Sequence, residues 1–503
     1  MLWMDLIADK IVEVYPGLEN YRCQCGMSTT GEAHFGNYRE LVIVYAVVRA
    51  LRIRGLSAEA ILSFDDFDRY KKLASNTPAC YQQYIGHPNF SIPSPYSAHE
   101  GYAEYFENRI LANLSRLQIG MTPVFQQELY RAGAYLEDLE TALCRHEQVM
   151  QIINGMKTEC LNKQKQMRYP VSVYCERCGK DFTEVLDYDR EKGLRYSCAC
   201  GFSNTQRLDR LWVKGIFKLD WPMRWKREKI VFEPAGRSHM EPLGAYSVSS
   251  RISRELFDWE PPLPLLYQFV SVKGQHGRMS KTAGEPLTPE KALALWGRDM
   301  FVWILAHKAP GEEITVSTSD GVETLYAEYE AFLKSQKPDD LREKQILEIG
   351  ESAYTVPFRC MLHELAAWGH DREALIAFKG WKDDLHTRDK LARVEYYLNN
   401  GYTGESFRIG ELRYELLSDE EKSILARFFW DLCDADGRAL DATGALAAVE
   451  RDGLSKMALT KALALLLFGK DHGPPLRRLL LAYPISAYRT QILERLRVGE
   501  GEQ

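Results

Sequence analysis

The clearest pattern of apolar and polar positions lies near the start of the chain. From Tyr21 to Cys25 every second residue is apolar, as on one face of a β-strand. From Leu41 to Leu51 apolar residues recur at steps of three and four, the spacing of a helix that packs on a core. Between them lies CGMSTTGEAHFGN, which is rich in small and polar residues. The pattern predicts a strand, a loop and a helix in succession.

That loop is a candidate phosphate-binding turn. Its His-x-Gly-Asn core consists of His34, Gly36 and Asn37, directly before the helix. Backbone N–H groups and the positive end of a helix dipole meet phosphate at such a turn. A His in a Gly-containing loop is, however, more often a capping or surface residue, so this stretch alone leaves both interpretations open.

A second buried strand is predicted over residues 60–64, and it runs into Asp65, Asp66 and Asp68. The carboxyl ends of strands in an open parallel sheet are where ligands bind. Acids at this place also cap the following helix. Capping and ligand contact are equally expected for Asp66 and Asp68, whereas Asp65 is assigned to ligand contact.

Strand and helix patterns alternate again further along the chain. A strand is expected to end at Leu219, and a helix to begin at Pro222. They are followed by the strand IVFEP, a helix over 245–257 and the strand LLYQFVSVKG. Such alternation predicts an α/β fold with a parallel sheet and crossover helices, of which this region is the second half.

The remaining segments complete the predicted domain organisation. Two helical stretches, 100–117 and about 124–165, belong to an insertion over 100–212 within a Rossmann-type sheet domain of residues 1–310. Strand patterns fade beyond Pro310. Residues 311–340 are therefore predicted to form a connector, and 341–503 an all-helical domain.

Four cysteines within the insertion have the spacing of a metal site. Two residues separate Cys175 from Cys178, and one separates Cys198 from Cys200. Thiolate pairs in tight turns are what a tetrahedral zinc site needs, and four protein ligands leave no position for a substrate. We therefore predict a structural zinc module over 172–203.

Composition narrows the class of protein. The chain has 503 residues, 45% of them hydrophobic, a net charge of -6 and eleven cysteines. This length predicts about three domains. No apolar window is long enough to span a bilayer, and no secretory leader is expected. The cysteine count favours a reducing compartment, by default the cytoplasm. The net charge neither supports nor excludes an RNA partner.

A basic loop follows the last strand of the predicted sheet. It reads RMSKTAG from Arg278 to Gly284. A loop that carries a cation can clamp transferred phosphates, although this sequence taken alone favours a solvated turn.

The ordered set HFGN, DDFD, four cysteines, DWPMRW, FEPAGRSH and RMSKT resembles class I lysyl-tRNA synthetase over essentially the whole chain. The resemblance implies a Rossmann-type catalytic domain and carboxy-terminal helices that recognise the anticodon of tRNA. It implies that ATP is bound by Gly31, His34, Gly36, Asn37, Met279, Ser280 and Lys281. It also implies an amino-acid pocket of Gly26, Ser28, Asp65, Trp221, His239 and Tyr267.

The chemistry of amino-acid activation fits these residues. His34 would donate to phosphate oxygens, Asn37 would order the turn, and Lys281 would hold the departing pyrophosphate. A lysine substrate needs a carboxylate for its α-ammonium, here Asp65, and an aromatic surface for its stem, here Trp221. Mg²⁺ is expected with ATP.

The chain departs from the family pattern beside the expected pocket. Residues 236–239 read Gly-Arg-Ser-His where the family usually has Gly-Lys-Asp-His, so Ser238 replaces an acid. Two other hypotheses stay open at this stage. The chain could be a paralogue that activates lysine or a related amino acid for an acceptor other than tRNA, or a catalytically silent RNA-binding descendant. No DNA or membrane partner is expected.

Overall fold

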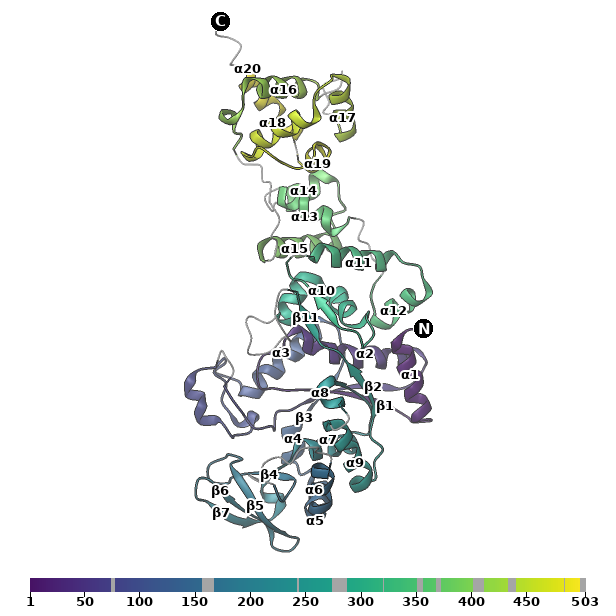
Figure 1. The fold of residues 1–503 in the computed structure, drawn as a ribbon, viewed down its shortest axis with the longest axis vertical. Coiled ribbons are helices and arrows are strands. Elements are labelled where there is room, and N and C mark those ends of the chain that lie inside the picture. The colour runs from purple at the N-terminus through teal and green to yellow at the C-terminus, as the bar shows by residue number, and fades with distance from the viewer. Residues whose placement is uncertain are drawn as a thin grey trace. The chain divides into compact units, whose positions relative to one another are not determined.

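The computed structural model describes residues 1–73, 77–155, 167–241, 244–273, 287–319, 321–350, 356–367, 372–400, 411–432, 440–483 and 485–497. They belong to two compact units. The first comprises Met1–Val316 and Ser335–Gly350, and the second comprises Ser317–Lys334 and Glu351–Gln503. Figure 1 shows that strands are confined to the first unit, and that the described part of the second unit consists of helices and their connections.

A five-stranded parallel sheet forms the centre of the first unit, and it confirms the predicted α/β class (Figure 1). Its strand order is β10-β9-β1-β2-β3. The strands are β1 (Tyr21–Met27), β2 (Ala58–Phe64), β3 (Thr122–Phe125), β9 (Ile230–Gly236) and β10 (Leu263–Tyr267). The two halves predicted from the sequence thus meet where β9 pairs with β1.

The sequences of these strands consist mainly of apolar residues because the strands are buried. Every residue of β9 is buried, as in a parallel sheet that is covered on both faces. Helix α2 (Tyr38–Ile53) contacts β1, β2 and β9, and most of its side chains are buried. Arg39 at its start is also buried, and it donates to the backbone oxygens of Gln268 (2.6 Å) and Ala309 (3.1 Å).

The register aligns the carboxyl ends of the central strands. Met27 pairs with Phe64 across β1 and β2, and Gly236 pairs with Tyr267 across β9 and β10. The loops that follow these strands therefore open at one edge of the sheet, where parallel α/β folds place their ligands.

The remaining elements of the first unit surround this sheet or extend from it. Strands β4 (Val171–Tyr174) and β8 (Trp212–Gly215) form an antiparallel pair. A three-stranded antiparallel sheet contains β5 (Thr183–Asp189), β6 (Gly193–Cys198) and β7 (Ser203–Gln206). Strands β11 (Val270–Val272) and β12 (Ile314–Val316) form a parallel pair. The helices are α1 (Trp3–Val14), α3 (Tyr102–Arg116), α4 (Gln126–Arg131), α5 (Leu136–Cys144), α6 (His146–Gly155), α7 (Phe217–Glu228), α8 (Arg237–Met240), α9 (Ala245–Phe257), α10 (Pro289–Ala306) and α12 (Pro338–Leu347).

The stretch expected to be helical over about 124–165 is helical in most of its described part, but it is not continuous. The structure has the edge strand β3 up to Phe125 and then three short helices, α4, α5 and α6. Gly133 follows α4 with a φ of +74°, the left-handed conformation that ends helices. Gly133 thus separates α4 from α5, a break that the apolar pattern of the sequence did not indicate.

The expected boundary at Leu219 and Pro222 also differs from the structure. Strand β8 ends at Gly215, and helix α7 begins at Phe217 and continues through Pro222. A proline inside a helix leaves the carbonyl four residues earlier without its amide donor. Here that carbonyl belongs to Lys218, and the Ser249 hydroxyl donates to it at 3.0 Å. A tertiary hydrogen bond thus replaces the missing backbone bond.

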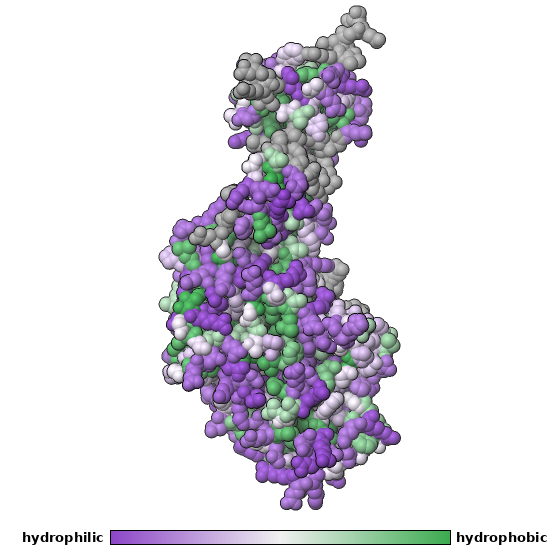
Figure 2. Space-filling model, turned by 180° about the vertical axis from the view of Figure 1, so that it is seen from behind, coloured by the Kyte–Doolittle hydropathy of each residue, from purple (hydrophilic) through white to green (hydrophobic). Residues whose placement is uncertain are grey.

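The second unit is helical in the part that the structure describes. Its helices are α11 (Val322–Lys334), α13 (Phe358–Ala367), α14 (Arg372–Lys379), α15 (Leu385–Asn400), α16 (Asp419–Trp430), α17 (Ala442–Arg451), α18 (Lys456–Phe468), α19 (Leu476–Ala482) and α20 (Arg489–Arg497). Apolar faces of α16, α17, α18, α19 and α20 share one core. Hydrophilic residues predominate on the face seen in Figure 2. Among the described residues, we find no helix with the length and hydropathy of a membrane span.

Candidate active site

A cavity of about 390 Å³ opens at the carboxyl edge of the sheet. The structure brings together on its walls all six residues that the resemblance implies for amino-acid binding: Gly26, Ser28, Asp65, Trp221, His239 and Tyr267. They come from strands β1 and β10, the loops that follow β1 and β2, and helices α7 and α8.

Gly26 and Ser28 form the part of the wall that follows β1. A Cβ at Gly26 would meet no atom within 4 Å, so the backbone here is open to a ligand. The Ser28 and Thr30 hydroxyls lie 2.9 Å apart. This wall is therefore lined by backbone and small polar groups.

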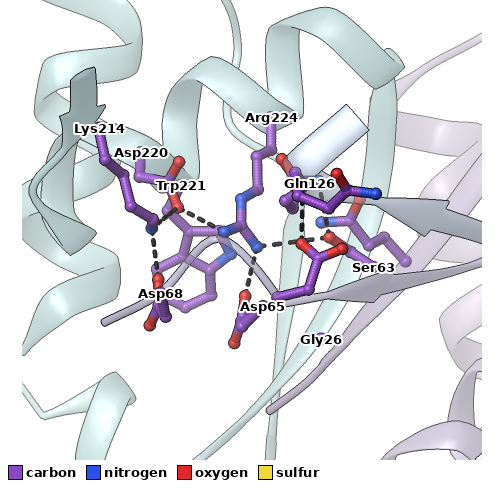
Figure 3. A network of polar contacts seen from close by, with 12 residues as sticks. Gly26, Ser63, Asp65, Asp68, Gln126, Lys214, Asp220, Trp221 and Arg224 are labelled. Atoms are coloured by element: carbon purple, nitrogen blue, oxygen red, sulfur yellow. Dashed lines mark hydrogen bonds and ion pairs between the residues drawn. The ribbon is translucent and has the colours of Figure 1, made fainter. Parts of the chain in front are cut away.

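Asp65 belongs to a buried network of charges (Figure 3). Nη1 of Arg224 donates to Oδ1 of Asp65 at 2.6 Å, and Nη2 of Arg224 donates to Asp220 at 2.5 Å. Lys214 lies 3.1 Å from Asp220 and 2.5 Å from Asp68. Two cations thus hold three carboxylates at one side of the cavity.

Burial and ion pairing act against each other in this network. Burial alone would raise the pKa of Asp220, but Arg224 and Lys214 hold it below the ordinary value. Burial raises the pKa of Asp65, which Arg224 lowers only in part. Asp220 is the firmly ionised member, while Asp65 would gain from a further cation.

The two acids that follow Asp65 have separate roles in the structure. Oδ1 of Asp66 accepts from the backbone N of Gln127 at 2.7 Å, so Asp66 caps the start of helix α4. Asp68 lines the cavity and pairs with Lys214. Asp66 is therefore a capping residue, but for a helix about 60 residues further along the chain and not for one that directly follows β2.

Aromatic side chains form another part of the wall. The Trp221 ring lies 5.2 Å from that of Phe217 and 5.9 Å from that of His239, measured between centroids. Trp221 is 8% exposed, and it turns its indole N–H inward to Oε2 of Glu233 at 2.9 Å. The aromatic face offers apolar contact to a ligand while its polar atom stays satisfied.

Glu40 and Glu233, which like Asp220 were not named in the sequence interpretation, also line the cavity. Oε2 of Glu40 accepts from the Tyr267 hydroxyl at 2.6 Å, and its Oε1 accepts from the backbone N of Gly26 at 3.3 Å. Glu233 accepts from the indoles of Trp221 and Trp225. Burial raises the pKa of Glu40 to about 8 and that of Glu233 to about 7.

The charges around the cavity favour a cationic ligand. Its lining includes two cations, Lys71 and Arg224, and five acids, Glu40, Asp65, Asp68, Asp220 and Glu233. Buried carboxylates are costly to ionise, which is why the pKa values of Glu40, Glu233 and Asp65 are raised. A ligand with ammonium groups would remove that cost.

The predicted phosphate-binding turn lies between β1 and α2. His34 precedes a single 3-10 turn, Phe35–Asn37. The backbone N of His34 donates to Oδ1 of Asn37 at 3.0 Å, so Asn37 orders the turn. Phe35 is fully buried against Trp296 and Phe301, with ring centroids 5.1 and 4.7 Å away.

The second half of the predicted ATP site, Met279, Ser280 and Lys281, lies outside the described residues. The residue that follows that undescribed stretch, Leu287, accepts from the backbone N of Phe35 at 2.8 Å. Leu287 is therefore hydrogen-bonded directly to the turn that carries His34.

The four cysteines form a compact group, as their spacing predicts. All four Sγ atoms lie within 4.8 Å of one another, with 3.8 Å between Cys175 and Cys200 and 3.6 Å between Cys178 and Cys198. Zn–S bonds of about 2.3 Å place tetrahedral thiolates about 3.8 Å apart. The donor set and its size fit a zinc ion.

Sequence reasoning missed several site residues: Gln24, Glu40, Asp220, Arg224 and Glu233. Gln24 and Glu233 interrupt buried apolar strands, and a polar residue in such a strand needs a partner. Arg224 is within the DWPMRW motif, but its partners Asp65 and Asp220 come from different elements. Only the fold shows that these side chains meet.

The chain was compared with known proteins. Residues 1–353 match the family model of tRNA synthetases class I (K). A lysine–tRNA ligase of Treponema pallidum is 31% identical over 78% of this chain and 76% of its own length. A lysine–tRNA ligase of Thermococcus kodakarensis is 26% identical over 99% of both chains.

A solved glutamate–tRNA synthetase from Elizabethkingia anophelis has 14% identity and a TM-score of 0.44, covering 95% of this chain and all of its own. The family model covers well over half of this chain, and the Treponema relative covers more than two thirds of it. The chain therefore belongs to the class I lysyl-tRNA synthetase family.

Proposed function

We propose that the chain activates lysine with ATP and transfers the lysyl group to tRNA, and that the cavity at the sheet edge is its lysine pocket. The observation that carries the assignment of the pocket is the combination of five acids with an aromatic wall in one cavity. Lysine has two ammonium groups joined by an apolar stem, so it complements both features.

In this proposal the α-ammonium of the lysine substrate binds beside Asp65, at the edge of the charge network. Arg224 occupies Oδ1 of Asp65, while Oδ2 remains as an acceptor at the cavity wall. An ammonium group beside it would offset the burial that raises the pKa of Asp65. The lysine stem then lies along Trp221, and the open backbone at Gly26 admits the carboxylate end.

The turn with His34 serves the first chemical step. A carboxylate oxygen of lysine attacks the α-phosphorus of ATP, the bond to pyrophosphate breaks, and lysyl-adenylate forms. His34 donates to the phosphate oxygens as they gain charge, and Lys281 holds the pyrophosphate. The anchoring of Leu287 to Phe35 supports a site shared by these two segments. Mg²⁺ accompanies ATP in this proposal, with no residue assigned to it.

A terminal ribose hydroxyl of tRNA then attacks the lysyl carbonyl and releases AMP. The second unit recognises the anticodon in this proposal. Its support is the helical architecture of the described part, together with the full-length match to the Thermococcus enzyme.

Transfer to tRNA is tested with labelled lysine, ATP and a lysine-specific tRNA transcript. We expect acid-precipitable lysyl-tRNA, and none when the anticodon is replaced by that of another amino acid. Adenylate formation without any charging of tRNA would instead favour a paralogue with another acceptor.

The four cysteines hold a structural zinc ion in this proposal. Replacing Cys198 by serine is expected to remove near-stoichiometric zinc, because three thiolates bind the ion less well, and to lower the thermal stability of the module. Metal content by mass spectrometry and thermal melting measure both effects. The exposed Cys80, which lies outside the cluster, is the matched control: Cys80→Ser is expected to keep the zinc. Unchanged zinc content in the Cys198 variant would contradict the assignment.

A further inference from the structure

The loop that leads from β1 to the His34 turn alternates in burial. Its buried positions are Thr29, Gly31, Ala33 and Phe35. Glu32 and His34 lie between them and are partly exposed. Successive side chains of an extended segment point to opposite sides, so these two residues share the less buried side of the loop. Contacts of Glu32 therefore act on the backbone two residues before His34.

Helix α3 holds this loop at two points. The residues at steps of three and four on one face of the helix are Tyr102, Tyr105, Arg109 and Asn113. The Tyr102 hydroxyl donates to the backbone oxygen of Thr30 at 3.3 Å. Nη2 of Arg109 donates to Oε1 of Glu32 at 2.6 Å. Both contacts lie in the stretch that precedes His34.

Arg109 also reaches the start of helix α10. The same nitrogen, Nη2, donates to Oε1 of Glu290 at 3.3 Å. Burial raises the pKa of Glu290, but hydrogen bonds, first that of Asn113, and the charge of Arg109 hold it below its ordinary value. Helix α10 begins two residues after Leu287, which accepts from the backbone N of Phe35. Arg109 therefore joins the loop on one side of His34 to the helix whose start is bonded to the other side.

Tyr105 fixes the orientation of the Arg109 guanidinium. Its hydroxyl accepts from Nη1 at 3.3 Å, and its ring centroid lies 5.7 Å from the guanidinium carbon. One nitrogen is thus bound to Tyr105 while the other is shared by two carboxylates, so the side chain is held in one geometry.

The two carboxylates need this cation because they contact the same nitrogen atom. The oxygens of Glu32 and Glu290 that bind Nη2 lie close together as a result. Like charges at short distance repel each other. Loss of the guanidinium would therefore release the loop from α3 and also push Glu32 away from α10.

We propose that Arg109 is a positioning residue for amino-acid activation, which holds the loop before His34 in place by joining Glu32 to Glu290. A donor to phosphate has to be oriented before charge develops in the transition state. Arg109 does not line the cavity at the sheet edge, so it acts through the loop. The inference rests on the proposed function, since it concerns the turn assigned to ATP.

Arg109→Met tests this role in lysine-dependent ATP–pyrophosphate exchange. We expect kcat to fall about 10- to 100-fold, the cost of displacing a reacting group by about 1 Å. KM for lysine should stay within about twofold, because the walls of the cavity are unchanged. The midpoint in urea should change little, since the Arg109 side chain is 38% exposed and such ion pairs add little to stability.

Two further variants separate positioning from a general structural role. Arg109→Lys is expected to keep kcat within about fivefold of the wild type, because one nitrogen makes both carboxylate contacts and an ammonium group can replace it. Adding Glu32→Gln to Arg109→Met is expected to raise kcat by about fivefold or more over Arg109→Met alone, because it removes the repulsion between the two carboxylates.

Arg251→Met is the matched control. Arg251 pairs with Glu255 at 2.9 Å on helix α9, and its side chain is 46% exposed. We expect wild-type exchange from this variant. A kcat within about twofold of the wild type in Arg109→Met would overturn the inference. A fall in kcat that Glu32→Gln does not relieve would also overturn it, as would one matched by a large fall in the urea midpoint. A wild type without any lysine-dependent exchange would instead refute the proposed function itself.

Discussion

Replacing Arg224 by methionine is expected to destabilise the first unit by about 3–5 kcal/mol and to abolish most of its activity. Arg224 is 5% exposed, and it is the cation shared by Asp65 and Asp220. Without it Asp220, which is 1% exposed, keeps only Lys214 as a counter-charge, and Asp65 loses the partner that orients it. Urea denaturation followed by tryptophan fluorescence reports the change, since Trp221 and Trp225 lie beside the network.

Arg254→Met is the control for this prediction. Arg254 also pairs with a carboxylate, Glu260, at 2.6 Å, but both side chains are more than half exposed. Surface pairs contribute about 0–1 kcal/mol, so its midpoint in urea should stay close to that of the wild type. Equal shifts in the two variants would show that the buried network has no special role.

Replacing His34 by alanine is expected to slow lysine-dependent ATP–pyrophosphate exchange by about 100- to 1000-fold, the usual cost of losing one donor to a charged transition state. The turn itself should persist. Two of its hydrogen bonds, from His34 N to Asn37 Oδ1 and from Asn37 N to His34 O, use no side-chain atom of His34 and remain in the variant. The loss should therefore appear in kcat, with zinc content and the urea midpoint retained.

His99→Ala provides the comparison for that variant, because His99 is exposed and does not line the cavity. It is expected to exchange at the wild-type rate. A His34 variant that retains exchange within about threefold of the wild type would remove the role assigned to the turn.

The local pattern was enough to predict β1, β2 and β9, but it missed the edge strand β3 and joined β10 to β11, which lies in another sheet. Helix α9 occupies residues 245–257 as expected, and β1, β2 and β9 occupy the predicted runs. Buried parallel strands and helices packed on them have strong periodic patterns that depend little on distant residues. The cysteine cluster follows directly from spacing for the same reason.

The interior of the site could not be predicted in this way. Its network joins Asp65, Lys214 and Arg224 from three elements, and no local signal specifies which acid meets which cation. The same limit explains Pro222, which is tolerated inside α7 only because Ser249 supplies a distant donor. Gly133 is the opposite case: its signal is local, but the helical pattern on both sides of it led to the prediction of one helical stretch.

The departure from the family motif at residues 236–239 does not leave the cavity without acidic side chains. The chain has Ser238 where the family usually has an acid, yet five acids line the cavity without it. The charge that a lysine substrate needs is therefore present in the structure. Glu40 and Glu233 supply part of it from inside α2 and β9.

ATP–pyrophosphate exchange across all twenty amino acids, with and without tRNA, tests the central claim most directly. The account predicts exchange that depends on lysine and is strongest with lysine among the twenty. It also predicts that the rate falls in the His34 and Arg224 variants. Exchange that is equally strong with a neutral amino acid, or no exchange with any amino acid under either condition, would contradict it.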